Sequence, residues 1–168
     1  MIGWAWILLA LIGIQRLAEL ALAKRNTARL MAEGATEHGA GHYPLFVLLH
    51  GSWLAVMALL TDPAPPVDWA LAAGFAALFV ARFWVIASLG RFWTTRIVTL
   101  PGVPLVRRGP FRLIRHPNYL IVALEVPLVP LLLGLPWVAL VWGLMNLALL
   151  AWRIRAEEAA LAPRRELA

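Results

Sequence analysis

The sequence of 168 residues contains no cysteine and few charged side chains, and both deficits narrow the possible functions. Without cysteine the chain has no disulfide framework, no thiolate metal site and no cysteine nucleophile. Only 14% of the residues are charged, whereas 62% are hydrophobic. A soluble domain is usually about 45–50% apolar, so this composition indicates an integral membrane protein.

Acidic residues are also scarce, nine against fifteen basic residues, which gives a formal net charge of +6. Nucleic acid is one partner for such a balance, but the basic residues lie mainly between apolar runs. Membrane topology and an anionic lipid surface explain that placement better, so no nucleic-acid partner is expected. The chain also lacks the G-x-G-x-x-G segment of a Rossmann nucleotide-binding domain.

Five apolar segments dominate the chain. Residues 2–23, 43–60 and 69–89 are long enough, or nearly so, to cross about 30 Å of hydrocarbon as helices. Residues 119–133 and 137–152 rise only about 22–24 Å each, and a Gly-Leu-Pro turn joins them. The sequence therefore predicts an all-α integral membrane protein with about five transmembrane helices, the last two forming a helical hairpin. We expect one membrane domain over 1–168, with three spans in 1–90 and a loop, the hairpin and a C-terminal helix in 91–168.

The distribution of arginine predicts the orientation of these helices. The basic segments around 24–42 and 90–116 and the tail from Arg153 are expected in the cytoplasm, and the acidic segment 61–68 outside. The N-terminus then lies outside and the C-terminus in the cytoplasm. The first apolar run lacks the basic start and the cleavage site of a signal peptide, so we expect it to remain as a span.

Residues 107–120, RRGPFRLIRHPNYL, combine four arginines with two proline turns directly before an apolar run. The residue before a proline avoids helical geometry and proline suits the first helical position, so the fourth helix should begin at Pro117, with His116 near its cap. The free backbone N–H groups of that helix start favour a carboxylate or phosphate. The alternative is that His-Pro-Asn-Tyr only caps a span.

The tail adds a second polar group. Arg153 and Glu157 share one face of a helix that continues the fifth span, and Glu158 follows. Because the hairpin makes the start of the fourth helix a neighbour of the end of the fifth, residues 116–119 and 153–157 should meet at one place. For Arg153 and Glu157 alone, an ordinary ion pair on a solvated helix is the simpler explanation.

In combination these features resemble the isoprenylcysteine carboxyl methyltransferase family, through Gly-x-Phe/Tyr-x-x-x-Arg-His-Pro-x-Tyr, a two-helix hairpin and Arg-x-x-x-Glu-Glu. The residues that carry the likeness are Gly109, Phe111, Arg115, His116, Pro117, Tyr119, Arg153, Glu157 and Glu158. The segments IQRLAELALAKRN and GHYPLFVLLH resemble a bacterial branch of that family. Members of that branch are similar to O-methyltransferases that act on long-chain alkylpyrones and phenolic lipids made by type III polyketide synthases.

The resemblance implies S-adenosylmethionine bound at the cytoplasmic face of a bacterial inner (plasma) membrane. The cofactor contacts it implies are Pro104, Leu105, Val106, Phe111, His116, Pro117, Asn118, Tyr119 and Glu157. Arg153 would orient the acceptor, a phenol, enol or carboxylate oxygen of a lipid that enters from the bilayer, with a polyketide lipid favoured. Family members carry tyrosine or glutamine where this chain has Phe111 and Arg96, which removes a hydroxyl and leaves the second contact open.

Three alternatives remain open at this stage. One is an isoprenylcysteine-type carboxyl methyltransferase, and another is a membrane lipid reductase that uses NADPH. In the third, the protein binds membrane lipids without catalysis, and both polar motifs are helix caps and ion pairs.

Charged residues also lie inside the predicted spans, where polar groups usually pair or line a cavity. Arg16 and Glu19 should meet on one face of the first helix, and Arg82 is expected to reach toward the cytoplasmic end of the third. Glu125 is a candidate proton acceptor in an acceptor tunnel, although pairing with Arg16 or Arg82 is favoured. His50, in the second span, is a candidate catalytic base.

Histidine spacing gives little support for a metal site. His38 and His42 are four residues apart, but Gly39 and Gly41 disfavour the helix that this spacing requires. With no cysteine and no acidic cluster nearby, no metal is predicted. His42 is instead expected to mark the start of the second span.

Overall fold

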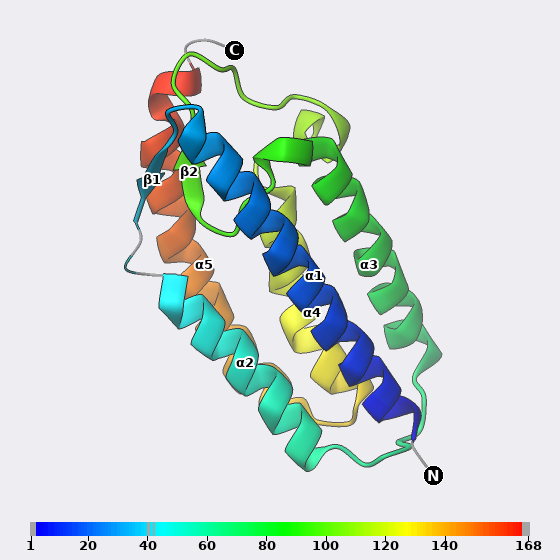
Figure 1. The fold of residues 1–168 in the computed structure, drawn as a ribbon. Coiled ribbons are helices and arrows are strands. Elements are labelled where there is room, and N and C mark those ends of the chain that lie inside the picture. Colours follow the sequence, from blue (N-terminus) through cyan, green and yellow to red (C-terminus); the bar gives the residue numbers. More distant parts are fainter. Residues whose placement is uncertain (1–2, 40, 42, 166–168) are drawn as a thin grey trace.

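The computed structural model describes residues 3–39, 41 and 43–165, and within them five α-helices form an elongated bundle (Figure 1). The helices are α1 (Trp4–Ala32), α2 (Tyr43–Leu60), α3 (Trp69–Leu89), α4 (Pro117–Leu132) and α5 (Pro136–Arg165). Within the described residues, α1, α2, α3 and α5 are long and apolar enough to span a membrane, whereas α4 is shorter. The prediction of five helices is confirmed, and four of them are long and apolar enough to be membrane spans, which indicates an integral membrane protein; that the short α4 also crosses the bilayer stays a prediction. His42 lies outside the described residues.

Local sequence explains where several helices begin and end. The carboxylate of Asp68 accepts hydrogen bonds from the backbone N–H groups of Ala70 and Leu71 and so caps α3. α1 continues beyond the predicted end at residue 23 because no glycine or proline interrupts it before Gly34. Gly34 adopts a φ of 92°, and the N–H of Ala35 bonds to the carbonyl of Leu30, which is a Schellman ending.

The hairpin of α4 and α5 is confirmed. Gly134 turns the chain with a φ of 74°, and the N–H of Leu135 donates to the carbonyl of Pro130 at 2.8 Å. α4 has 16 residues and therefore rises about 24 Å, less than the hydrocarbon thickness. α5 has 30 residues and includes the predicted cytoplasmic tail, so the fifth span and the tail are one continuous helix.

The basic connecting segments lie at one end of the bundle and the acidic connecting segment at the other (Figure 1). The ends of α1 and α3, the start of α4 and the end of α5 lie together, with the arginine-rich segments beside them. The acidic segment 61–68 and the hairpin turn lie at the opposite end. This grouping is the one that the charge pattern requires, and the side of the membrane that each end faces stays a prediction.

A short β-ribbon departs from the all-α prediction. β1 (Thr36–His38) pairs antiparallel with β2 (Ile97–Thr99), with Thr36 opposite Thr99. The His38 Nε2 atom lies 2.8 Å from the Thr99 hydroxyl, so the pairing is supported by side chains. Three-residue strands separated by about sixty residues leave no periodic signal in a sequence, which is why the ribbon was missed.

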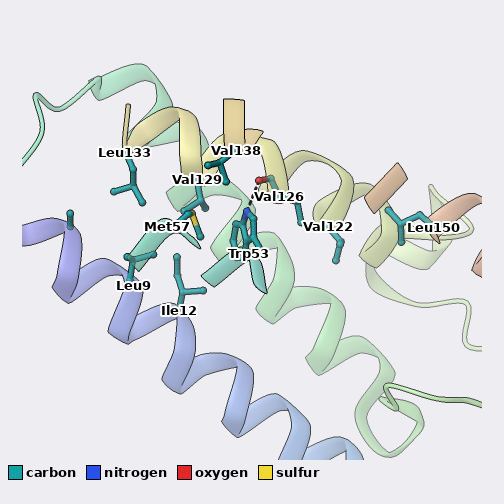
Figure 2. Packing of buried hydrophobic residues seen from close by; sticks show 11 residues of the cluster. Leu9, Ile12, Trp53, Met57, Val122, Val126, Val129, Leu133, Val138 and Leu150 are labelled. Carbon is teal, nitrogen blue, oxygen red and sulfur yellow. Dashed lines mark hydrogen bonds between the residues drawn. The ribbon is translucent and has the colours of Figure 1, made fainter. Parts of the chain in front are cut away.

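The apolar core joins α1, α2, α4 and α5 and includes Leu9, Ile12, Trp53 and Met57 (Figure 2). The indole N–H of Trp53 donates to the carbonyl of Val126 at 3.0 Å, drawn as a dashed line in Figure 2. That carbonyl would normally accept from residue 130, but Pro130 has no N–H. Trp53 therefore replaces the missing helical hydrogen bond while it packs α2 against α4.

A buried cluster of four charges connects α1, α3 and α4. Glu19 accepts hydrogen bonds from Nε and Nη2 of Arg82, each at 2.6 Å, and Arg16 contacts Glu19 at 3.3 Å. Glu125 accepts from Arg16 at 2.6 Å and lies 3.5 Å from Arg82. The pairing favoured for Glu125 is thus present. The expectation that Arg82 reaches toward the end of its span was wrong, because Arg82 is buried against Glu19, with 6% of its surface exposed.

Glu19→Gln is expected to lower the free energy of unfolding by about 3–5 kcal/mol, because the substitution leaves two buried guanidinium groups, those of Arg16 and Arg82, to share the one carboxylate of Glu125. Unfolding in detergent micelles, followed by circular dichroism, measures this loss. The matched control is Glu33→Gln, which removes the exposed 3.0 Å pair with Arg91 and should cost no more than about 1 kcal/mol. Equal losses in the two variants would contradict a structural role for the buried cluster.

Candidate functional site

A cleft of about 510 Å³ opens at the end of the bundle where α4 begins. Its walls come from the end of α3 and the following turn, from β2, from the segment before α4, from the first turn of α4 and from the last part of α5. The lining residues include Phe92, Trp93, Arg96, Leu105, Val106, Phe111, His116, Tyr119, Arg153, Glu157 and Arg164. Segments far apart in the sequence thus enclose one hollow.

The first turn of α4 supplies one wall of the cleft. Pro117 is the first helical residue and His116 the N-cap, as predicted from the His-Pro step. The His116 side chain makes no capping bond, so its ring is available to the cleft and stacks on Tyr119 with centroids 5.4 Å apart. The His116 Nε2 atom lies 3.4 Å from a carboxylate oxygen of Glu158 on α5.

The Tyr119 hydroxyl joins α4 to α5. It donates a hydrogen bond to Glu157, and it accepts one from Nε of Arg153 at 2.8 Å. Nη2 of Arg153 donates in turn to the carbonyl of Thr95 at 2.8 Å. The predicted meeting of residues 116–119 with Arg153 and Glu157 is therefore present.

Two aromatic rings lie close to the Arg153 guanidinium. Its central carbon lies 5.3 Å from the ring of Phe46 on α2 and 5.8 Å from the ring of Tyr119. Arg96 makes a similar contact with Tyr43, also on α2, at 4.9 Å. With Nε and Nη2 engaged, Nη1 of Arg153 has no hydrogen-bond partner among the described residues and is left to interact with a ligand.

Eight of the nine predicted cofactor contacts line the cleft. These eight are Leu105, Val106, Phe111, His116, Pro117, Asn118, Tyr119 and Glu157. Pro104 is not among the lining residues, and its carbonyl accepts a hydrogen bond from Arg164. That these eight residues bind a cofactor stays a prediction.

Two candidate catalytic residues lie elsewhere. Glu125 belongs to the buried charge cluster, and His50 lies on α2 with Nδ1 2.9 Å from the carbonyl of Phe46. Neither residue lines the cleft. Arg153, the third candidate, does line it, so the geometry supports a role only for Arg153.

Two residues that support the cleft were not recognised from the sequence. Asn26 is buried on α1, and its amide nitrogen donates to the carbonyls of Gly90 and Trp93, at 3.1 and 3.0 Å. These bonds fix the turn that places Trp93 in the cleft wall. A polar asparagine among the last turns of a long helix was the available signal, because buried amides need partners.

Arg164 is the second such residue. Near the end of α5, it donates to the carbonyl of Val103 at 2.7 Å and to that of Pro104 at 3.1 Å. Its guanidinium also lies 5.8 Å from the ring of Phe92. Arg164 is buried and has no acidic partner among the described residues. Arg164 thus holds the segment that leads into Leu105 and Val106 over the cleft.

No group of three or more histidine, cysteine or acidic residues within the described part of the chain is arranged to hold a metal ion. His38 is engaged with Thr36 and Thr99 in the β-ribbon, and His50 lies on α2. The cleft lining combines aromatic, apolar, arginine and carboxylate groups with the polar side chains of Thr94, His116 and Asn118.

Sequence comparison agrees with this geometry. The sequence profile of the isoprenylcysteine carboxyl methyltransferase (ICMT) family matches residues 70–163, which include nearly all of α3, every cleft-lining residue except Arg164, and the hairpin turn with α4 and most of α5. The chain belongs to the ICMT family. Membership in this family indicates a methyltransferase that uses S-adenosylmethionine.

Two curated bacterial proteins are similar over almost the whole chain. The "Uncharacterized protein YpbQ" of Bacillus subtilis (strain 168) is 38% identical over 160 residues, which cover 93% of this chain and 95% of the relative. An uncharacterized protein of Haemophilus influenzae is 30% identical over 156 residues, covering 87% and 88%. No solved structure matches the chain. These relatives extend the similarity to α1 and α2, which the family profile does not reach.

Arg164→Ala is expected to release the segment around Val103 and Pro104 and to speed tryptic cleavage after Arg107 several-fold, because two backbone carbonyls lose their donor. Limited proteolysis with mass spectrometry of the fragments measures the rate. Arg155→Ala, on an exposed position of the same helix, should cleave like the unsubstituted protein. Identical rates for all three proteins would show that Arg164 does not hold the segment.

Proposed function

We propose that this ICMT family member transfers a methyl group from S-adenosylmethionine to an oxygen of a lipophilic acceptor, and that this acceptor is a long-chain polyketide lipid with an acidic hydroxyl. One observation carries the proposal: the side chains of His116, Tyr119, Arg153 and Glu157 lie together in one cleft. This cleft is at the end of the bundle where α4 begins.

The cleft residues fit this cofactor in size and in chemistry. A volume of about 510 Å³ lies within the range of small-molecule sites. Leu105, Val106 and Phe111 offer an apolar and aromatic surface for an adenine ring. Glu157 offers a carboxylate to the ammonium group or the ribose hydroxyls, and it is hydrogen-bonded to Tyr119 in the first turn of α4. The free N–H groups at that helix start suit the cofactor carboxylate.

When bound, S-adenosylmethionine would supply a methyl group on a sulfonium: an ionised acceptor oxygen would take the methyl carbon while the sulfur–methyl bond breaks, and S-adenosylhomocysteine would be the leaving group. The protein then has to place the acceptor oxygen in line with that methyl group, and positioning alone contributes about 7–11 kcal/mol in favourable systems. Arg153 is suited to this task because Phe46, Tyr119 and the Thr95 carbonyl fix its guanidinium. Its Nη1 donor can therefore hold an anionic oxygen at one place.

An acidic acceptor suits a site of this composition. Phenols, enols and carboxylic acids lose their proton far more readily than alcohols, and a nearby guanidinium favours the ionised form. Glu125 and His50 lie outside the cleft, so the proposal assigns no base to either. The choice of a polyketide lipid rests on the resemblance of segments in α1 and α2 to a bacterial branch of the family. An isoprenylcysteine-type carboxylate is the nearest alternative acceptor.

Two other functions predict different ligands. A lipid reductase would bind NADPH, whose second nucleotide half needs additional protein surface beyond the short connection of residues 90–116 between α3 and α4. A protein that only binds lipids would bind neither cofactor. Calorimetry in detergent with S-adenosylhomocysteine, S-adenosylmethionine and NADPH separates the three, and we expect heat from the first two only.

Glu157→Gln is expected to weaken S-adenosylhomocysteine binding at least about tenfold, or about 1.4 kcal/mol, because a charged acceptor becomes a neutral amide. His116→Ala should weaken binding as well. Titration calorimetry gives both dissociation constants. Glu33→Gln is the control, since it removes the same charge from an exposed position that does not line the cleft, and it should change affinity by no more than about threefold. Unchanged binding by Glu157→Gln and His116→Ala would overturn the cofactor site.

Arg153→Lys is expected to lower methyl transfer about 100-fold while S-adenosylhomocysteine affinity stays within a few-fold. A lysine cannot keep the bonds to Tyr119 and Thr95 and also present a fixed donor, and small misplacement costs this much rate. Transfer of a radiolabelled methyl group into extracted membrane lipids, with mass spectrometry of the product, measures the rate and identifies the acceptor. Full transfer activity in the variant would remove Arg153 from the reaction.

A further inference from the structure

Residues 107–115, RRGPFRLIR, form a segment, here called the basic segment, that leads from the cleft into α4. Its charged residues are Arg107, Arg108, Arg112 and Arg115. None of them forms an ion pair with a described acidic residue. By contrast, Arg91 and Arg96, earlier in the same connection, pair with Glu33 and Glu37. The basic segment is therefore a concentration of positive charge to which the described residues supply no acidic partner.

Backbone packing places the basic segment beside the last turns of α3. Nε of Arg108 donates to the carbonyl of Ser88 at 2.7 Å. Gly109 has a φ of 58°, and a Cβ atom there would lie 2.1 Å from the Ser88 hydroxyl and 3.2 Å from the Trp84 indole nitrogen. Only glycine permits this close approach. The segment thus lies against the end of a membrane span, next to a half-exposed tryptophan of the kind that marks the headgroup layer.

The basic segment also exposes apolar side chains at the same level. Leu113 is 82% exposed and Ile114 is 43% exposed, between Arg112 and Arg115. Among the described residues outside the five α-helices, Val67 is the other large hydrophobic residue that is exposed. Apolar side chains flanked by arginine, at the end of a span, are the pattern of a segment that lies in the membrane interface.

We propose that the basic segment binds the headgroups of anionic phospholipids, with Leu113 and Ile114 inserted at the boundary of the acyl chains. A phosphate oxygen pair matches the two parallel N–H donors of a guanidinium, and an anionic lipid surface attracts clustered arginine. The partner is the phospholipid of the surrounding bilayer. Because the segment continues directly into His116 and Pro117, the bound lipid would hold one wall of the cleft. This inference requires no methyl transfer and stands apart from the proposed function.

The depth of the segment is the first test, and the cysteine-free sequence makes it direct. A spin label on Leu113→Cys is compared with one on Ala162→Cys, an exposed position near the end of α5, in phospholipid vesicles. Collision with oxygen and with a water-soluble nickel chelate reports depth. We expect the label at 113 to meet oxygen more and the chelate several-fold less than the label at 162. Equal exposure of both labels to the chelate would overturn the proposal.

Lipid selectivity is the second test. Spin-labelled phosphatidylglycerol is expected to associate with the protein several-fold more strongly than spin-labelled phosphatidylcholine. Arg112→Gln combined with Leu113→Ser, two positions outside the cleft lining, should reduce this preference, whereas Arg155→Gln should not. Gly109→Ala keeps every arginine but should also reduce the preference, because the segment cannot lie against Ser88. Circular dichroism verifies that each variant is folded.

Two outcomes would overturn the lipid assignment. One is an unchanged phosphatidylglycerol preference in the folded Arg112→Gln, Leu113→Ser variant. The other is displacement of the lipid by millimolar inorganic phosphate, which would make the segment a site for free phosphate.

Discussion

The structure depends on the neutralisation of four charges inside an apolar bundle. Arg16, Glu19, Arg82 and Glu125 come from three helices, and each would be costly at membrane depth without its partners. Their mutual contacts fix the register of α1 against α3 and α4. The cluster also reaches the site, because the Arg82 guanidinium lies 5.9 Å from the ring of Trp93, which lines the cleft. This neutral cluster of two arginines and two glutamates thus fixes where along the bundle the cleft forms.

Hydrogen bonds from three side chains hold the cleft together, and they engage polar groups that would otherwise have no partner. Tyr119 joins the two arms of the hairpin, Asn26 fixes the turn after α3, and Arg164 holds the segment before Leu105. The last two residues act through backbone carbonyls in irregular segments. Side chains must provide the bonds that regular secondary structure does not provide there. The walls of the cleft are consequently held largely by single side chains, and the two-stranded ribbon contributes only the part formed by β2.

The sequence predicted what depends on local chemistry. Proline fixes the residue before it, so the start of α4 at Pro117 followed from the His-Pro step. The meeting of Tyr119 with Arg153 and Glu157 followed from the short hairpin turn at Gly134. In both cases a few adjacent residues determine the geometry.

Contacts between segments far apart in the sequence could not be predicted. Four intramembrane charges were visible in the sequence, but which acid would meet Arg82 depends on how α1 packs against α3. The β-ribbon likewise depends on two three-residue strands brought together by the helices. Arg164 was one arginine among fourteen, and its role depends on where the segment at Val103 passes. Tertiary packing decides such contacts, and no local pattern encodes them.

The continuity of α5 has a consequence for the relation between the bilayer and the site. Its 30 residues form one helix about 45 Å long, from the hairpin turn to the cleft. A helix whose apolar length differs from the thickness of the hydrocarbon layer changes its tilt. Because Arg153, Glu157 and Arg164 all lie on α5, a change in the tilt of this helix moves the three residues together relative to the shorter α4. A change in bilayer thickness can therefore alter the distance between the cleft wall formed by α5 and the wall formed by the start of α4.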